Sequence, residues 1–268
     1  MTETSTEVGF YGKLPFKGDF LQRRAPQEFV DGWDAWLQEC MHASRRKLGD
    51  AWLDAYLTGP VWRFALDAGV CGSAAYAGIV VPSVDRVGRY FPLTVVARLA
   101  DGCSLLDVAC ADGWFDAAER LVLSALEAED LDIDAFEEQV AALREPLAPV
   151  TLARSPSLTG LIGASPFPRD SQCWHVPLDA ASGLQHALNA VAYRELSRAL
   201  QPLALWWTDG SAALGPAWLT TRGLPAAEAF AAMLTGEWTG SGWSSLAPAA
   251  EPAEAVIASQ EAPAAAGE

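Results

Sequence analysis

The segment Ala75–Leu99 has the sequence AYAGIVVPSVDRVGRYFPLTVVARL, in which two apolar runs enclose a charged loop. The runs Ala75–Val81 and Phe91–Leu99 are rich in β-branched and aromatic residues and are bounded by Gly or Pro, as β-strands commonly are. The loop Pro82–Tyr90 is short enough to connect two antiparallel neighbours. The segment therefore predicts a hairpin whose charged residues are gathered at the connection.

Strand and helix signals alternate irregularly on either side of this hairpin. Short apolar runs predict further strands at Val8–Tyr11, Val61–Leu66, Gln172–Pro177, Leu203–Trp207 and Ala217–Thr220. Helical spacing of apolar residues predicts helices over about 26–48, 50–57, 112–128, 133–143, 182–200 and 225–235, with Gly49 ending the first and Asp50 capping the second. This order predicts an α/β chain of the α+β type, with a central, largely antiparallel sheet and helices on both faces.

The chain of 268 residues carries a net charge of −16, and its acidity is concentrated in the second part. Residues 1–98 hold 11 basic and 11 acidic side chains, whereas residues 99–268 hold 7 basic and 23 acidic ones. Such a surface repels nucleic acid and anionic lipid, so a protein partner or a small ligand is the better expectation. Seven acids and no base lie between Glu127 and Glu138, which is typical of a solvated helix face.

Composition divides the chain into three parts. Residues 1–7 are polar and lack the basic and apolar regions of a signal peptide, so they are expected to be a flexible N-terminus. Residues 8–240 form the folded domain, and the Pro-, Ser- and Gly-rich stretch 144–170 is a long connection where two lobes could meet. Residues 241–268 are predicted to be a disordered acidic tail. No apolar run reaches the ~18–20 residues that span a bilayer, so we expect a cytoplasmic protein without membrane insertion.

Known catalytic and ligand-binding patterns are incomplete in this sequence. The loop Gly12–Asp19 contains Gly and Lys, but not in the order of a phosphate-binding P-loop, and Asp19 would repel phosphate. Cys173, His175 and His186 match no zinc-ligand spacing and suggest no fourth ligand. No Gly-x-Ser-x-Gly nucleophile motif occurs. We therefore predict no catalytic residue, no cofactor and no metal site.

The strongest local signal is the charged loop Ser83–Arg89. Arginine can hold a carboxylate or a phosphate through two parallel hydrogen bonds, which would make this loop a recognition surface. Alternatively, Asp85 accepts hydrogen bonds from Arg86 or Arg89, Gly88 allows the turn, and the charges hold the loop internally. Both interpretations stay open from the sequence.

The candidates for partner binding or for holding the loops come from this loop and from the loop after the first strand. They are Lys13, Lys17, Asp19, Ser83, Asp85, Arg86 and Arg89. A less favoured hypothesis is an enzyme acting on a phosphorylated substrate, in which Arg86 and Arg89 bind the anion and Asp85 or Asp19 is the base.

Several segments, taken in order, resemble one protein family. They are Gly9–Pro15 (GFYGKLP), Gly18–Phe20 (GDF), Trp33–Leu37 (WDAWL), Trp52–Leu53, Trp62–Phe64 (WRF), Gly78–Thr94 and Leu205–Gly210 (LWWTDG). Together they make residues 8–240 similar to the TagF family, also called ImpM, of bacterial type VI secretion accessory proteins. Phe16 stands where the resemblance leads us to expect a small polar residue, and the acidic tail lies outside the resemblance.

The resemblance implies a compact domain with a central antiparallel sheet, similar to longin or profilin-like folds. It also implies a cytoplasmic protein that represses type VI secretion after translation. Family members are thought to do so by binding the forkhead-associated (FHA) scaffold protein of the apparatus, whether or not that scaffold is phosphorylated. No catalytic residues are established for the family, so we expect no enzyme. The alternative is a structural adaptor of the apparatus, whose loss would abolish secretion rather than raise it.

Overall fold

A computed structural model describes residues 7–143, 192–193 and 196–244. At its centre is one sheet with the strand order β2-β1-β5-β4-β3-β6-β7, in which every neighbouring pair is antiparallel. The strands are β1 Val8–Gly12, β2 Leu21–Arg23, β3 Trp62–Leu66, β4 Tyr76–Val81, β5 Leu93–Arg98, β6 Leu203–Thr208 and β7 Ala217–Arg222. The predicted hairpin is the pair β4–β5, and it lies in the middle of the sheet.

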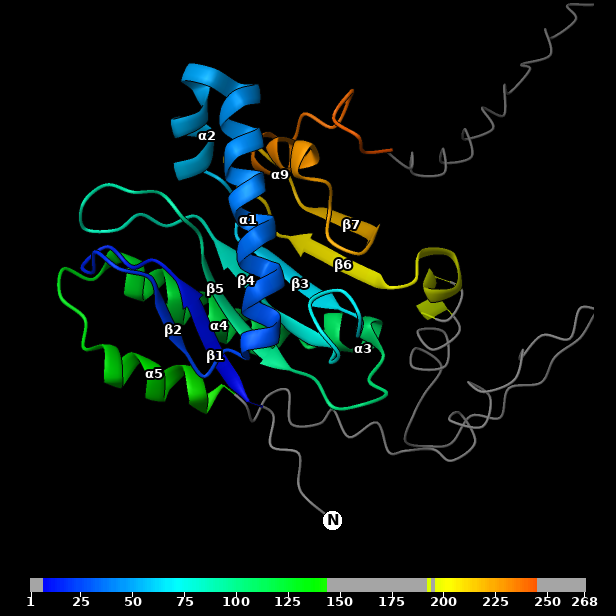
Figure 1. Cartoon of the computed structure of the whole chain (residues 1–268), viewed down its shortest axis with the longest axis horizontal. Coiled ribbons are helices and arrows are strands. Elements are labelled where there is room, and N and C mark those ends of the chain that lie inside the picture. The colour runs from blue at the N-terminus through cyan, green and yellow to red at the C-terminus, as the bar shows by residue number, and fades with distance from the viewer. Residues whose placement is uncertain (1–6, 144–191, 194–195, 245–268) are drawn as a thin grey trace, which may run out of the picture.

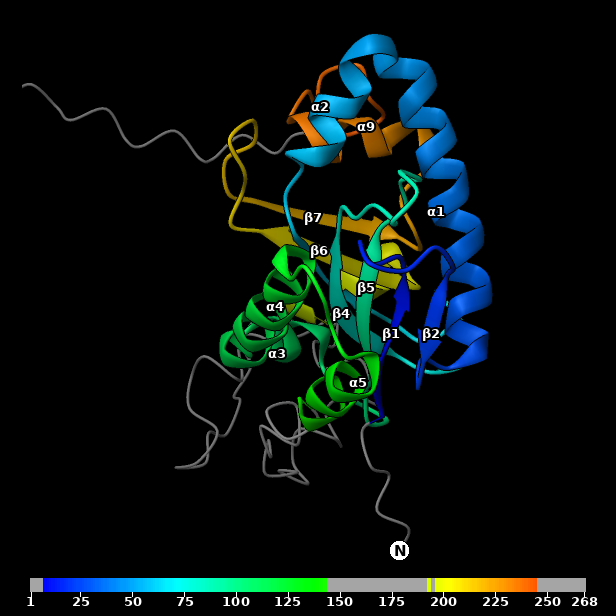
Figure 2. The same cartoon turned by 90° about the vertical axis from the view of Figure 1, so that its left-hand side faces the viewer.

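Helices cover both faces of this sheet, as Figure 1 and Figure 2 show from two directions. One face carries α1 Gln27–Leu48, α2 Trp52–Leu57 and α9 Phe230–Thr235, and the short 3-10 helices η1 Gly49–Ala51 and η2 Ala227–Ala229 precede α2 and α9. The other face carries α3 Leu105–Ala109, α4 Asp112–Glu127 and α5 Ile133–Ala142. The prediction of an α+β fold with an antiparallel sheet and helices on both faces is confirmed.

Burial on both faces explains why the strands are continuous apolar runs. Successive side chains of a strand point to opposite faces. In β3, Phe64 and Leu66 pack in the core under α1, whereas Ala65 packs in the core under α4 and α5. Every residue of β1, β3 and β4 is buried. Since neither face of these strands meets solvent, the usual alternation of polar and apolar residues is absent.

Aromatic side chains fill the space between α1 and the sheet. Trp33 is fully buried, with ring centroids 4.6 Å from Phe64 and 5.8 Å from Trp206. Its indole N–H donates to Thr94 Oγ1 at 2.9 Å, so the one polar group of this ring is satisfied. The helical spacing of tryptophans in α1 is therefore a packing feature.

A few local predictions differ from the structure. α1 ends at Leu48, and Gly49 caps its end with a φ of 53°, as expected. Asp50 does not cap the next helix: the residue before α2 is Ala51, without a side-chain cap, because η1 joins α1 to α2 directly. The sequence does not predict β2 and α3, since segments of 3 and 5 residues are too short to show a periodicity.

Several sequence predictions fall on residues outside the described ranges. These are the strand at 172–177, most of the helix at 182–200, the tail beyond residue 244, and Cys173, His175 and His186. The strands on either side of 144–191 belong to the same sheet, because β6 pairs with β3. Within the described part of the chain, no helix has both the length and the apolar character needed to cross a bilayer.

Gly78 tests how closely the centre of the sheet is packed. A Cβ at this position would lie 2.2 Å from the carbonyl oxygen of Val95 and 2.6 Å from Cζ of Phe64. We expect Gly78→Ala to lower the free energy of unfolding by about 3 kcal/mol, because a central strand and a buried ring cannot both move away. Gly113→Ala on α4 is the matched control, since the added methyl group would meet no neighbouring atom within 4 Å, and there we expect a gain of about 0.5–1 kcal/mol. Urea denaturation measures both variants, and equal stabilities would contradict this packing.

Candidate functional site: two loops joined by a buried ion pair

Two loops meet at the edge of the sheet where β1 and β4 end. Both strands pair antiparallel with β5, which lies between them. β1 and β4 therefore run in the same direction, and their carboxyl ends lie on either side of the start of β5. Residues 13–20 follow β1, and residues 82–92 connect β4 to β5. We call these two segments the loop pair; both lie at the left-hand end of the molecule in Figure 1.

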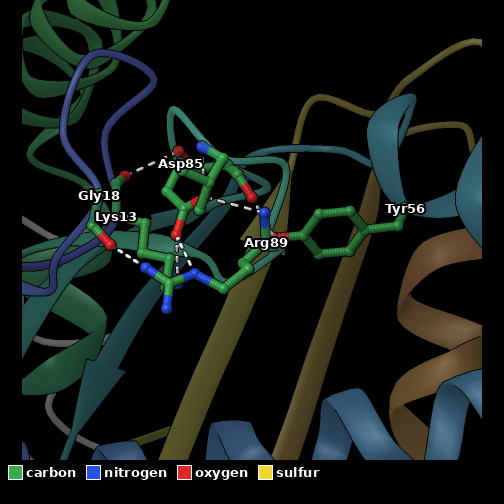
Figure 3. Close-up of polar contacts among 7 residues, drawn as sticks. Lys13, Gly18, Tyr56, Asp85 and Arg89 are labelled. Carbon is green, nitrogen blue, oxygen red and sulfur yellow. Dashed lines mark hydrogen bonds and ion pairs between the residues drawn. The ribbon is translucent and has the colours of Figure 1, made fainter.

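A buried ion pair joins the two loops (Figure 3). Lys13 Nζ lies 2.6 Å from Asp85 Oδ2, and the two side chains are 5% and 0% exposed. Two further contacts lie beside it: the Ser83 hydroxyl donates to the carbonyl of Lys13 at 2.7 Å, and the Arg86 N–H donates to the carbonyl of Lys17 at 3.1 Å. A further hydrogen bond joins the loops, from the Arg89 guanidinium to the carbonyl of Gly18, so four polar contacts connect them.

Asp85 also organises the second loop by itself. Its Oδ1 accepts from the backbone N–H groups of Val87 at 3.0 Å and Arg89 at 2.9 Å. Its Oδ2 accepts from Nε of Arg89 at 2.7 Å, in addition to Lys13. Gly88 has a φ of 83°, a value that favours glycine, and its N–H donates to the carbonyl of Asp85. The expected internal ion pair is therefore made with Arg89.

The surroundings of the Asp85 carboxyl group favour its ionised form. Burial by itself raises the pKa of a carboxyl group. Here the hydrogen bonds from Lys13, from Arg89 and from the N–H of Val87 outweigh burial and hold the pKa of Asp85 well below its ordinary range. Such a group is a weak proton acceptor near neutral pH, and its oxygens are already occupied by donors. This environment disfavours Asp85 as the base of an enzyme.

α2 reaches the second loop through Tyr56. The Tyr56 hydroxyl donates to the carbonyl of Ser83 at 2.9 Å and accepts from the Ser83 N–H at 3.0 Å. The Tyr56 ring is fully buried and stacks on Trp52, and both rings meet the edge of Tyr90. Tyr56 is not among the residues predicted from the sequence. The available signal was its position four residues after Trp52, which places both rings on one side of the helix.

The structure separates the seven candidate residues into two groups. Those that hold the loops are buried or bonded within them: Lys13, Ser83, Asp85 and Arg89. The Arg89 guanidinium also donates to the carbonyl of Gly18, although 58% of its side chain is exposed.

The other group consists of Lys17, Asp19 and Arg86, whose side chains are exposed. None of the three makes a side-chain hydrogen bond or ion pair with another described residue. Asp85 and Arg89 therefore fit the interpretation in which ion pairs stabilise the loop internally. Arg86 instead fits the interpretation in which the loop binds a partner.

A second charged cluster lies on the α4 side of the sheet and was missed from the sequence. Arg63 of β3 is buried, and its guanidinium donates to Asp116 at 3.0 Å, Glu119 at 2.8 Å and Asp209 at 2.9 Å. It links β3, α4 and the turn after β6. Arg63 and Asp209 both lie in segments that carry the family resemblance, but nothing in the sequence indicates that the two form an ion pair. Among the described residues, no group of three or more His, Cys, Asp or Glu side chains could hold a metal ion.

Comparison with known proteins identifies the family of this domain. The family model of the TagF N-terminal domain, type VI secretion system-associated, matches residues 9–143, a span that contains the whole loop pair. The chain belongs to the TagF family. PA0076 from Pseudomonas aeruginosa PAO1, a solved structure, shares 40% sequence identity with a TM-score of 0.68, and the match covers 91% of this chain and 99% of that chain. No curated protein matches the chain. Membership associates this TagF-family protein with the bacterial type VI secretion system.

The lowered pKa of Asp85 predicts how stability depends on pH. The carboxyl group has a lower pKa in the folded protein than its value of about 4 in an unfolded chain, so its contribution is complete above that pH. The contribution is lost as the pH falls from there toward the folded-state pKa. We therefore expect the stability difference between the wild type and Asp85→Asn to be large at pH 7 and to shrink between about pH 5 and pH 2.

Urea denaturation across this pH range measures the effect. Asp19→Asn is the matched control, because Asp19 is exposed and makes no ion pair with a described residue, and its stability should follow the wild type at each pH. A constant gap between the wild type and Asp85→Asn would show that the Asp85 carboxylate is not held as described.

Proposed function

We propose that this TagF-family protein is a post-translational repressor of type VI secretion. It acts in the cytoplasm by binding and sequestering an FHA-domain scaffold protein of the secretion apparatus. Two lines of argument support the proposal: membership of a type VI secretion-associated family, and a loop pair inside the matched domain that is suited to binding a protein.

The observation that supports the proposal most is that the loop pair combines a buried ion pair, which we call its base, with exposed side chains above it, which we call its rim. Lys13 and Asp85 form the buried base, whereas Lys17 and Arg86 are exposed. Val87 at the tip of the second loop is also 62% exposed. A surface held in one conformation loses less entropy on binding than a mobile one. A protein partner therefore gains more affinity from these contacts than it would from two free loops.

The same rim supports binding that does not depend on scaffold phosphorylation. Arginine and lysine bind carboxylates as well as phosphates through charge-assisted hydrogen bonds. Carboxylates on the scaffold would satisfy Lys17 and Arg86 without any phosphate. The proposal assigns the protein no catalytic role, and the enzyme alternative would be supported only by turnover of phosphoester substrates with added divalent metals.

Co-elution with the scaffold tests the proposal. Purified protein is mixed with the FHA scaffold from the same bacterium, phosphorylated or not, and the mixtures are separated by size exclusion. We expect a stable complex in both states. We also expect Arg86→Ala to weaken it about tenfold without changing the melting temperature, because the exposed Arg86 side chain makes no hydrogen bond or ion pair with a described residue. Arg120→Ala, at an exposed position on α4, is the control.

The outcomes separate the alternatives. Absence of a complex in both states would contradict scaffold binding. Deletion of the gene should raise secretion by the bacterium if the protein is a repressor. Loss of secretion on deletion would instead favour the structural adaptor.

A further inference from the structure

Four exposed cations lie on or next to the loop pair. Lys17 and Arg86 are adjacent, because the N–H of Arg86 donates to the carbonyl of Lys17. Arg89 follows in the same loop. Arg45, near the end of α1, lies beside the second loop, since its guanidinium is 4.2 Å from the ring centre of Trp52 and 5.9 Å from that of Tyr90. We call Lys17, Arg86, Arg89 and Arg45 the basic strip.

Two apolar side chains lie beside the basic strip and are held in place. Phe20 is 47% exposed and Val87 is 62% exposed. The Phe20 ring stacks on Tyr11, meets Phe91 edge to face at 4.8 Å, and lies 4.8 Å from Nζ of Lys13. An exposed aromatic ring with so many fixed contacts presents a constant surface, and aromatic side chains, phenylalanine among them, are enriched in protein–protein interfaces.

The strip contrasts with the charge of the rest of the molecule. The chain has a net charge of −16, and Asp19 is the exposed acid within the loop pair itself. The connection between α4 and α5, which includes Glu129, Asp130 and Asp132, lies at the same end of the molecule in Figure 1 and faces the viewer in Figure 2. A negatively charged partner is repelled by this connection and by most of the surface, so the strip sets both where it binds and how it is oriented.

We propose that the basic strip is the docking face for an acidic segment of the partner protein, with Phe20 and Val87 receiving apolar side chains of that segment. This inference rests on the proposed function and specifies the chemistry of the scaffold surface that the loop pair recognises. Charge complementarity supports this assignment, because cations that, apart from Arg89, have no ionic partner among the described residues lie near one another in a protein that is otherwise acidic.

The lysine content of the chain makes a direct test possible. Only three lysines occur: Lys13, Lys17 and Lys47. Lys13 is buried against Asp85, so of the three lysines a carbodiimide reagent, which joins an amine to a carboxylate, can reach Lys17 on the strip and Lys47 at the end of α1. In the complex with the scaffold we expect cross-links from Lys17 to Asp or Glu of the scaffold, identified by mass spectrometry. Lys17→Arg should keep the complex and remove that cross-link. Cross-links confined to Lys47 would overturn the proposal.

The affinity of charge-reversal variants for the scaffold tests the proposal quantitatively. We expect Lys17→Glu with Arg86→Glu to weaken scaffold binding at least tenfold near 0.15 M salt. The matched control is Arg98→Glu with Arg120→Glu, which makes the same change in net charge at exposed positions on β5 and α4 and should bind like the wild type. Asp19→Lys should tighten binding. Equal affinity of the two double variants, each with a wild-type melting temperature, would overturn the proposal while leaving scaffold binding itself intact.

If the wild type forms no complex with the scaffold, the proposed function fails and poly-L-glutamate becomes the probe of the strip. Fluorescence anisotropy should then show binding of labelled poly-L-glutamate to the wild type, its loss in Lys17→Glu with Arg86→Glu, and its retention in the control. Absence of binding to the wild type would overturn the docking face as well.

Discussion

The ion pair between Lys13 and Asp85 determines how this end of the molecule is built. It connects the ends of β1 and β4 across the start of β5, with both side chains removed from solvent. A buried carboxylate or ammonium group without a partner is strongly unfavourable, so each of the two loops is unstable in this position without the other. The Asp85 hydrogen bonds then shape the second loop, and Tyr56 joins the loop to α2.

The sheet supplies the conditions for this ion pair. Because helices cover both faces, the middle strands are buried throughout, and the loops at their ends begin from fixed positions. Lys13 and Asp85 start from such positions and complete a buried contact. Lys17 and Arg86, a few residues farther along, reach solvent. The loop pair therefore divides its charged residues into a supporting set and an exposed set, and Arg89, which pairs with Asp85 but is 58% exposed, belongs to both.

Much of the fold could be predicted from the sequence, because long apolar runs and helical spacing depend on neighbouring residues. The hairpin β4–β5 and helices α1, α4 and α5 were found in this way. Of the two ionic partners of Asp85, only Arg89 could be predicted, because it is four residues away in the sequence. Lys13 is brought close only by the order of strands in the sheet. Arg63 was missed for the same reason, since its acidic partners come from α4 and from the turn after β6.

Hydrogen exchange in Lys13→Met tests most directly whether the buried ion pair holds the two loops together. The informative amides are those of Arg86, which donates to Lys17, and of Val87 and Arg89, which donate to Asp85. Our account predicts that all three exchange faster in the variant, while the amides of β5 keep the protection of the wild type. Wild-type protection at Arg86 in the variant would show that the loops stay joined without the ion pair and would contradict the account.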